Sequence, residues 1–318
     1  MYDTSFLVSI LIPTYNRATI IGETLDSIQQ QQYPHWECII VDDGSTDATE
    51  KVVHSYTSND HRFQYYHRPK NLPKGGNAAR NYAFSKSRGE YIQWFDSDDL
   101  MTPDFLQKKV EVFAKSPELD FVVSRTMNFK GSEKMSISHY DDNLQFPLSL
   151  SGFLKKQVYF MTPDVLFKRE SVACIKFDEH LRSAQETNFF IRFLAQDTLQ
   201  GSYINETLTL RRIHPASIQQ GVKKNHKQAT LEKLLSYVQA FFSIQKKVDQ
   251  GLREIMIHDL IMLFYHLKFP GVPLGVFLKF LLVLTQTKGV LKATAFLFAM
   301  VLVSIFNKGY NLVNYARS

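Results

Sequence analysis

The sequence of 318 residues has only two cysteines, Cys38 and Cys174, and no pair of them at a metal-binding spacing. Both lie in apolar, strand-like segments, so we expect two small core residues in a reducing compartment. No G-x-G-x-x-G loop follows an apolar run, which argues against a dehydrogenase. A signal peptide is not expected either, because Asp3 comes early and Pro13 interrupts the first apolar run.

Long hydrophobic runs are also missing. The longest run of apolar or small residues, Ala293 to Phe306, has 14 residues, whereas a helix needs roughly 20 to span a bilayer. The surrounding segment, Leu252–Ser318, has helical patterns, seven Lys or Arg and two Asp or Glu. It is interpreted as a basic helical hairpin lying in the plane of a membrane, or as helices packed on the rest of the chain or on a second subunit.

The composition favours a folded, basic protein. Hydrophobic residues make up 44% of the chain and charged residues 21%, so a large core is expected and wholesale disorder is not. The net charge of +6 suits a nucleic acid, a phosphorylated substrate or an anionic membrane surface. Because the positive charge concentrates in the apolar tail, a membrane surface explains it better than a nucleic acid.

Short apolar runs alternate with helical patterns over the first 125 residues. Strands are expected over Phe6–Ile12, Trp36–Val41, Arg62–His67, Gly89–Phe95 and Leu119–Ser124, with helices over Ala18–Gln31 and 103–115. This alternation predicts an α/β fold with a mostly parallel sheet flanked by helices. Such sheets bind ligands at the carboxyl ends of their strands.

Polar clusters fall at three of these strand ends: Thr14–Asn16, Asp42–Asp43 and Asp96–Asp99. Carboxylates this close repel one another, and they need a cation, backbone donors or open water. We therefore expect the three clusters to meet at the mouth of one site.

The pattern loosens after residue 126. A polar loop is expected over 132–146, strands around a turn over 158–170, a helix over 184–196, and a strand from Leu208 that runs into a polar loop. We expect residues 1–222 to form one domain. Residues 223–318 are expected to form a helical region that associates with a membrane or forms a homo-oligomer.

Five blocks occur in an order that resembles the family 2 glycosyltransferases with the GT-A fold. They are VSILIPTYNR, CIIVDDGSTDAT, GGNAARNYAFSKSRGEYIQWFDSDD, TPDFL and RIHPASI, and together they run from about Val8 to Ser217. The resemblance implies a Rossmann-like GT-A sheet. It also implies inverting transfer of a sugar from a nucleoside-diphosphate sugar, foremost a UDP-sugar, to a hydroxyl of a saccharide or lipid-linked acceptor.

The resemblance also implies that the product is a surface glycan. The basic, apolar tail, which lies outside the resemblance, predicts an enzyme that is peripheral on the cytoplasmic face of the inner membrane.

The resemblance assigns roles to residues of the three clusters. Those expected at the donor nucleotide are Pro13, Thr14, Tyr15, Asp43, Arg80, Asp96 and Ser97. Asp98 is expected to bind Mg²⁺ or Mn²⁺, and His214 matches a position that in some members completes the metal site or touches the diphosphate. General chemistry supports a metal-binding role for Asp98 independently of the resemblance. Carboxylate and phosphate oxygens are ligands that Mg²⁺ and Mn²⁺ prefer, and such an ion stabilises a leaving diphosphate as a Lewis acid.

Glu186 stands where the family has its catalytic base. It would take the proton from the acceptor hydroxyl as that oxygen attacks the anomeric carbon. Gln185 and Asn188 depart from the family pattern, in which their positions are commonly acidic. An alternative role for Glu186 is a carboxylate favoured only by the dipole at a helix start.

Two other function classes stay open. A nucleotidyltransferase would usually need a Gly-rich, basic phosphate loop, which PTYNR does not supply. A membrane-associated, non-catalytic scaffold would have a degenerate site, whereas Asp43, Asp96, Asp98 and Glu186 are all present.

Overall fold

The computed structural model describes residues 6–131, 133–135, 140, 144–213, 226–269 and 271–318. The chain divides into two compact units, one of Met1–His180 with Gln196–Pro215 and one of Leu181–Ala195 with Ala216–Ser318. In the described part of the chain, no helix is both long and apolar enough to cross a bilayer.

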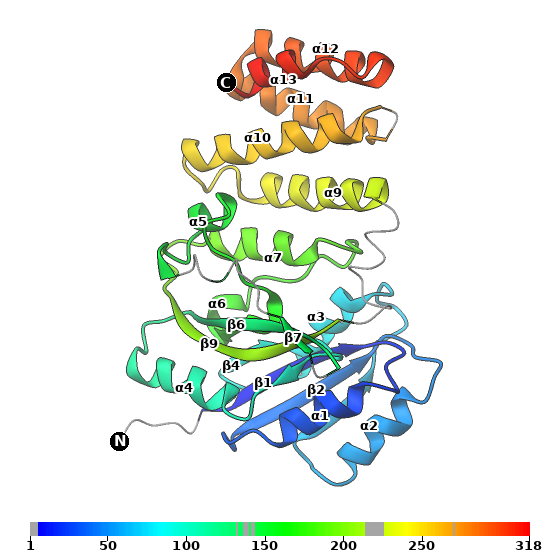
Figure 1. Cartoon of the computed structure of the whole chain (residues 1–318), viewed down its shortest axis with the longest axis vertical. Coiled ribbons are helices and arrows are strands. Elements are labelled where there is room, and N and C mark those ends of the chain that lie inside the picture. Colours follow the sequence, from blue (N-terminus) through cyan, green and yellow to red (C-terminus); the bar gives the residue numbers. More distant parts are fainter. Residues whose placement is uncertain (1–5, 132, 136–139, 141–143, 214–225, 270) are drawn as a thin grey trace. The chain divides into compact units, whose positions relative to one another are not determined.

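The first unit is built on one mixed sheet (Figure 1). The strand order is β3-β2-β1-β4-β8-β6-β9-β5, and β7 pairs with β6. The strands are β1 Val8–Thr14, β2 Trp36–Asp42, β3 Phe63–His67, β4 Tyr91–Trp94, β5 Leu100–Met101, β6 Phe121–Lys130, β7 Glu133–Met135, β8 Val165–Lys168 and β9 Gly201–Arg212. All five strands expected in the first 125 residues are present, with ends shifted by a few residues.

Helices cover both faces of this sheet. The helices of the first unit are α1 Ile21–Gln29, α2 Thr49–Thr57, α3 Gly76–Lys86, α4 Phe105–Lys115, α5 Leu150–Leu154 and α6 Arg169–Val172, with a short 3₁₀ turn, η2, at Thr162–Asp164. Val8, Ile10 and Ile12 point to one face, where they pack with α1, α2 and α4. On the other face α3 packs against β1 and β2. Burial on both faces explains why β1 is a continuous apolar run and does not alternate.

The parallel half of the sheet sets the site. β3, β2, β1 and β4 run parallel, with Thr14 beside Asp42 and Leu11 beside Trp94 in register. The carboxyl ends of these strands therefore lie together, as the sequence predicts.

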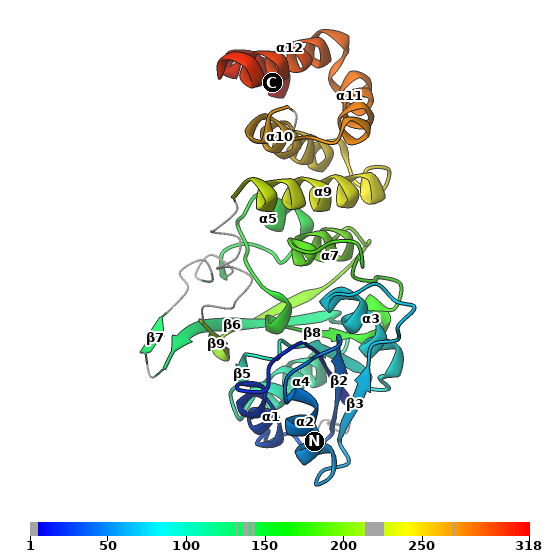
Figure 2. The same cartoon turned by 90° about the vertical axis from the view of Figure 1, so that its right-hand side faces the viewer.

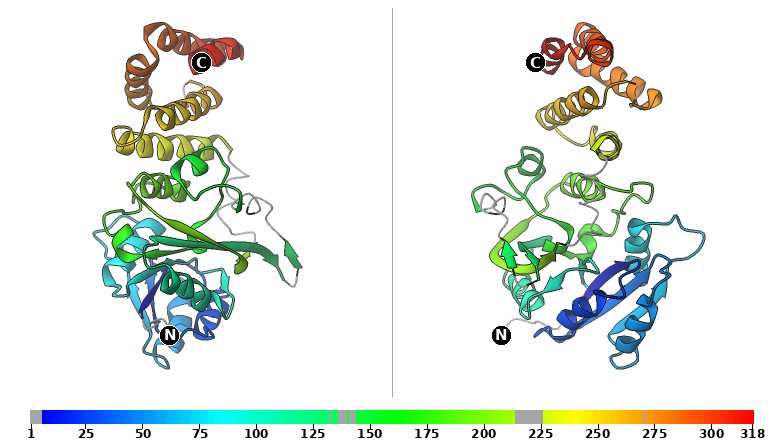
Figure 3. Two further views of the ribbon diagram at one scale, coloured as in Figure 1. Left: turned by 90° about the vertical axis from the view of Figure 1, so that its left-hand side faces the viewer. Right: turned by 45° about the vertical axis from the view of Figure 1, so that its right-hand side comes forward.

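The other half of the sheet is mixed. β8 runs antiparallel to both β4 and β6, and β9 runs parallel to β6. Figure 3 shows β6 and β9 side by side, with β7 turning back on β6. β7 lies in the segment for which only a loop was expected, and the turn expected within 158–170 is η2 followed by β8.

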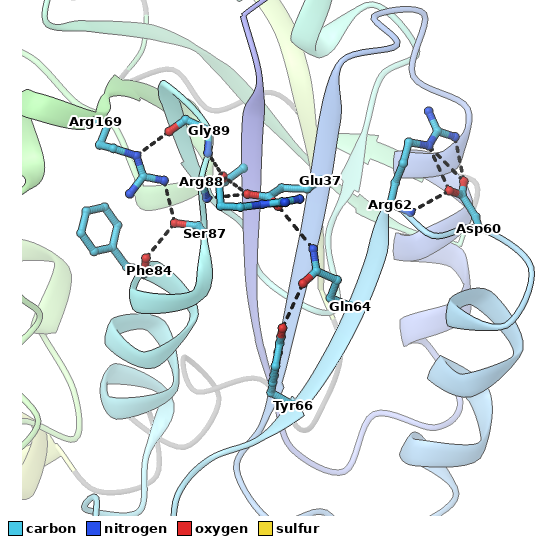
Figure 4. A network of polar contacts seen from close by, with 11 residues as sticks. Glu37, Asp60, Arg62, Gln64, Tyr66, Phe84, Ser87, Arg88, Gly89 and Arg169 are labelled. Carbon is cyan, nitrogen blue, oxygen red and sulfur yellow. Dashed lines mark hydrogen bonds and ion pairs between the residues drawn. The ribbon is translucent and has the colours of Figure 1, made fainter.

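A buried polar network closes the amino-terminal end of the parallel strands (Figure 4). The Glu37 carboxylate accepts hydrogen bonds from Ser9 Oγ at 2.7 Å, from the Arg88 N–H at 2.6 Å and from Gln64 Nε2 at 3.3 Å. Burial alone would raise the pKa of Glu37, but hydrogen bonds from Arg88 and Ser9 outweigh it and lower the pKa. The network joins β1, β2, β3 and the residues before β4, so the opposite end of the sheet is left for ligands.

The second unit is helical (Figure 2). Its helices are α7 Gln185–Leu194, α9 His226–Ile244, α10 Gln250–Leu267, α11 Leu274–Lys288, α12 Val290–Phe306 and α13 Tyr310–Arg317. α7 packs on α9, and α10 contacts both α9 and α13. Phe264, Phe277, Phe280 and Phe296 form an aromatic cluster that joins α10, α11 and α12. The helices expected in the tail are thus present.

The two cysteines differ in their surroundings. Cys38 is buried in β2, as expected, but Cys174 is exposed. The expectation for Cys174 was wrong, because it follows α6 in a turn and does not lie in a strand.

Candidate active site

The turns after β1 and β2 are joined by hydrogen bonds between backbone and side chains. The Asn16 N–H donates to Ser45 Oγ at 2.8 Å, and the Arg17 N–H donates to Thr49 Oγ1 at 2.8 Å. Asn16 adopts a left-handed backbone conformation with φ 50°, which Asn tolerates better than most residues. These bonds hold Arg17 at the carboxyl end of the sheet.

The two carboxylates after β2 have different partners. Asp42 is 1% exposed, and its carboxylate accepts bonds from the Gly44 and Ser45 N–H groups at 2.8 and 2.6 Å. It is therefore a structural residue of the turn. Asp43 pairs with Arg68 and accepts a bond from the Gly75 N–H at 3.0 Å, just before α3.

Two arginines lie at the carboxylates that follow β4. Arg80, from α3, donates to Asp96 Oδ1 at 2.7 Å. Arg17 Nη2 lies 3.5 Å from Asp98 Oδ2. Each carboxylate thus meets a cation from another segment, which lowers the repulsion between them.

Asp99 and Arg212 fix the loop that carries these carboxylates. Asp99 is 2% exposed and accepts a bond from the Arg212 N–H at 3.0 Å. Burial, with the charges of Asp96 and Asp98, raises the pKa of Asp99 well above its usual range. The Arg212 guanidinium donates to the Asp98 carbonyl at 3.0 Å and to Glu23 at 2.8 Å. The next residue along β9, Arg211, instead contacts Asn128 and Met161, so only Arg212 reaches this loop.

Three buried polar atoms here have no hydrogen-bond partner within the described part of the chain. They are Thr14 Oγ1, Arg17 Nε and Arg80 Nε. Buried polar atoms are nearly always paired, so these three atoms, from the end of β1, the turn after it and α3, indicate a place for a polar ligand. Tyr15 adds an exposed ring, with Lys74 Nζ 4.5 Å from its centre.

The donor set fits a divalent metal that the substrate helps to bind. Among the described residues, no three His, Cys, Asp or Glu side chains gather in a metal-binding group. Mg²⁺ is usually held by one or two carboxylates together with substrate phosphates. Asp98 supplies such a carboxylate, and Asp96 lies in the same loop.

Most of the predicted donor-site residues are therefore brought to one edge of the sheet by β1, β2, α3 and β4. They are Pro13, Thr14, Tyr15, Asp43, Arg80, Asp96, Ser97 and Asp98. His214 lies outside the described residues. Arg17 and Arg68 were not assigned by the sequence reasoning; Arg17 lies three residues after the end of β1, a position that could have indicated it.

Glu186 is the second residue of α7 in the other unit. The start of α7 is held on α9, because Ser236 Oγ donates to the Ala184 carbonyl at 2.7 Å and Asn188 Nδ2 donates to the Ser236 carbonyl at 2.9 Å. Asn188 is 1% exposed. Its departure from the acidic family pattern thus coincides with a structural role between two helices.

Residues 9–175 match the model of the protein family described as "Glycosyl transferase family 2". The chain belongs to this family. Among relatives of this chain, an uncharacterized glycosyltransferase of Rickettsia typhi is 30% identical over 221 residues, which cover 66% of this chain and 65% of the relative. The chain thus spans slightly less than two thirds of that relative's length.

Solved structures show the same GT-A fold. TarS residues 1–349 of S. aureus, in complex with UDP, has a TM-score of 0.60 and 18% identity, with coverage of 97% of this chain and 90% of TarS 1–349. The mannosyltransferase PcManGT of Pyrobaculum calidifontis, in complex with GDP-Man and Mn²⁺, has a TM-score of 0.57 and 18% identity, with coverage of 99% and 86%. At this identity the likeness establishes the fold alone.

Proposed function

We propose that this family 2 glycosyltransferase moves a sugar from a nucleoside-diphosphate sugar to a hydroxyl of a saccharide or lipid-linked acceptor. The observation that carries the proposal is the set of buried polar atoms of Thr14, Arg17 and Arg80 that have no hydrogen-bond partner among the described residues, two of them on arginines that pair with Asp96 and Asp98. Cationic donors and a metal-binding carboxylate at one edge suit a diphosphate. The complexes of TarS with UDP and of PcManGT with GDP-Man support a donor of this class.

The donor roles follow from chemistry and family. Asp43 contacts the base beside Pro13, Thr14 and Tyr15, and Arg80 with Asp96 and Ser97 contacts the nucleotide. Asp98, with His214, would hold Mg²⁺ or Mn²⁺, and such an ion would supply positive charge to the leaving diphosphate. A UDP-sugar is the first donor to test.

Glu186 is proposed as the base. Its carboxylate accepts the acceptor hydroxyl proton while that oxygen attacks the anomeric carbon and the nucleoside diphosphate leaves from the opposite side. This single displacement inverts the anomeric configuration. Residues 1–222 would form the transferase domain, and the enzyme would work on surface glycans at the cytoplasmic face of the membrane. The relatives reported above give no support to a nucleotidyltransferase or a scaffold.

A donor screen tests the proposal. Purified protein is incubated with Mn²⁺ or Mg²⁺ and a panel of UDP- and GDP-sugars, and released nucleoside diphosphate is measured. We expect metal-dependent release from one donor, because slow hydrolysis needs no acceptor. Asp98→Asn should abolish it, whereas Glu118→Gln, an exposed carboxylate outside the site, should leave it unchanged.

Binding provides the second readout. If none of the donors is hydrolysed, titration calorimetry with UDP and GDP shows whether a nucleotide binds with the metal. Absence of both hydrolysis and metal-dependent nucleotide binding in a folded protein would refute the transferase proposal and favour a scaffold.

A further inference from the structure

Exposed large apolar side chains concentrate at the end of the second unit. Within the described residues there are fourteen, and twelve of them lie between Leu274 and Tyr315, the other two being Tyr15 and Leu144. Leu291 is 76% exposed and Leu282 is 65% exposed. Single exposed apolar residues are normal on a soluble protein, but a concentration of this kind marks an interaction surface.

On α12 the exposed residues form one stripe. Val290, Leu297 and Val301 are spaced by seven and four residues, and Leu291, Phe298 and Ile305 by seven. At 3.6 residues per turn these six positions fall on one side of the helix.

The opposite side of α12 is buried. Phe296, Met300 and Val303 lie there, and α12 packs on α11 and α13. The exposed stripe thus belongs to a helix that is already packed in the unit. Thr294, the exposed polar residue within the stripe, donates its hydroxyl to the Val290 carbonyl at 2.9 Å, which lowers the cost of removing it from water.

A second stripe lies on α11. Leu274, Leu278 and Leu282 are exposed at intervals of four residues. Phe277, Phe280 and Leu284 are buried on its other side. The two stripes, Leu274–Leu282 on α11 and Val290–Ile305 on α12, are called the apolar face below.

The charge around the apolar face is mainly positive. Residues 260–318 contain six Lys or Arg and no Asp or Glu, and Lys279 and Lys308 are exposed. Glu254 of α10 lies 3.8 Å from Lys288, but a second copy of the chain docking by this face would mainly bring like charges together. An anionic bilayer supplies both hydrocarbon for the leucines and phosphates for the lysines.

We propose that the apolar face docks on an anionic bilayer surface, with α11 and α12 in its outer layer and Lys279 and Lys308 at the lipid phosphates. The proposal rests on the second unit alone and is independent of the transferase chemistry. Each lysine near an anionic surface is worth about five-fold in binding. Loss of the apolar contacts also weakens binding, because the affinity scales with the buried apolar area as well as with the charge.

Vesicle flotation of the full chain, without nucleotide or metal, tests this proposal. One set of vesicles is pure phosphatidylcholine, and the other contains phosphatidylcholine and phosphatidylglycerol in a two-to-one ratio. We expect strong binding to the anionic vesicles only. The combined change Leu291→Gln, Phe298→Gln and Ile305→Gln should weaken binding at least ten-fold, whereas Leu144→Gln, an equally exposed leucine of the first unit, should not.

Two further measurements concern how deeply the apolar face enters the bilayer and the oligomeric state of the protein. The natural tryptophans, Trp36 and Trp94, are buried in the first unit, so a Phe298→Trp variant reports on the apolar face. Brominated lipid should quench the new tryptophan and leave the natural ones unchanged. Equal flotation of the triple variant and wild type, or no quenching at position 298, would overturn the proposal. Failure to bind anionic vesicles, with a dimer that the triple variant dissociates, would assign the face to a second copy.

Discussion

Replacing Arg17 with glutamine is expected to change metal binding and nucleotide binding in opposite directions. Arg17 Nη2 lies 3.5 Å from Asp98 Oδ2, and the two side chains are only 23% and 19% exposed. The backbone of Arg17 is held by Thr49, so its cation stays near the carboxylate. A divalent ion that binds Asp98 must compete with this guanidinium, whereas a diphosphate beside it gains from the same positive charge.

The magnitude follows from the geometry of the pair. An exposed ion pair contributes about 0.2–1 kcal/mol to stability. Because both side chains are only partly exposed, the pair of Arg17 and Asp98 should contribute about 1 kcal/mol. Removal of the competing cation should therefore tighten Mn²⁺ binding about five-fold without nucleotide. UDP binding without metal should weaken by a similar factor.

Electron paramagnetic resonance of free Mn²⁺ and calorimetric titration with UDP measure the two affinities. Arg62→Gln is the matched control, because it removes the same charge from a pair with Asp60 that lies outside the site. A general effect of net charge would appear in both variants. The reasoning is refuted if Arg17→Gln leaves Mn²⁺ binding unchanged or weakens it relative to Arg62→Gln.

Three further predictions concern stability and the base. Glu37→Gln should lower the free energy of unfolding by about 2 kcal/mol at pH 7. Because the pKa of Glu37 is lowered in the folded protein, this difference between wild type and variant should shrink as the pH falls below about 4. Urea unfolding at several pH values measures it. Lys109 donates to the Asp164 carbonyl at 2.7 Å, and burial lowers the pKa of Lys109 and raises the pKa of Asp164 to about 6. Lys109→Met and Asp164→Asn should each lower the free energy of unfolding by about 3–5 kcal/mol, and the double variant should lose clearly less than the sum of the two. Additive losses in tryptophan-monitored unfolding would show that the two groups are not coupled. Glu186→Gln should lower the rate of sugar transfer at least 100-fold, because a general base contributes about 10²–10⁴-fold. Mn²⁺ and UDP binding, measured by calorimetry, should not change. A near-normal rate of transfer would restrict Glu186 to a role at the helix start.

Much of the fold was predictable because a buried parallel strand can be recognised from its own few residues. Each needs a short apolar run, and its carboxyl end is marked by the polar residues that follow. The same reasoning located the clusters at Thr14, Asp43 and Asp96–Asp98. Family resemblance then chose Asp43 over Asp42, and the structure shows Asp42 engaged by the turn N–H groups.

The pairings between distant segments were not predictable in this way. Arg17 reaches Asp98 across 81 positions of sequence, and Arg212 reaches Asp99 across 113. Such contacts depend on strand order and register, which no local pattern contains. The exposure of Cys174 shows the same limit, since an apolar neighbourhood in sequence does not decide which residues a turn leaves in water.

The sequence by itself thus determined the strand ends, the chemistry of the carboxylates and the apolar, basic character of the tail. These depend on residue type, on continuous apolar runs for the strands and on a period of 3.6 residues for the helices. Only the tertiary structure decided which arginine meets which carboxylate and which side of α12 is exposed. Packing selects one face of a helix that is apolar all round, because the neighbouring helices α10, α11 and α13 cover only its other face, and no local pattern says how they fold back on it.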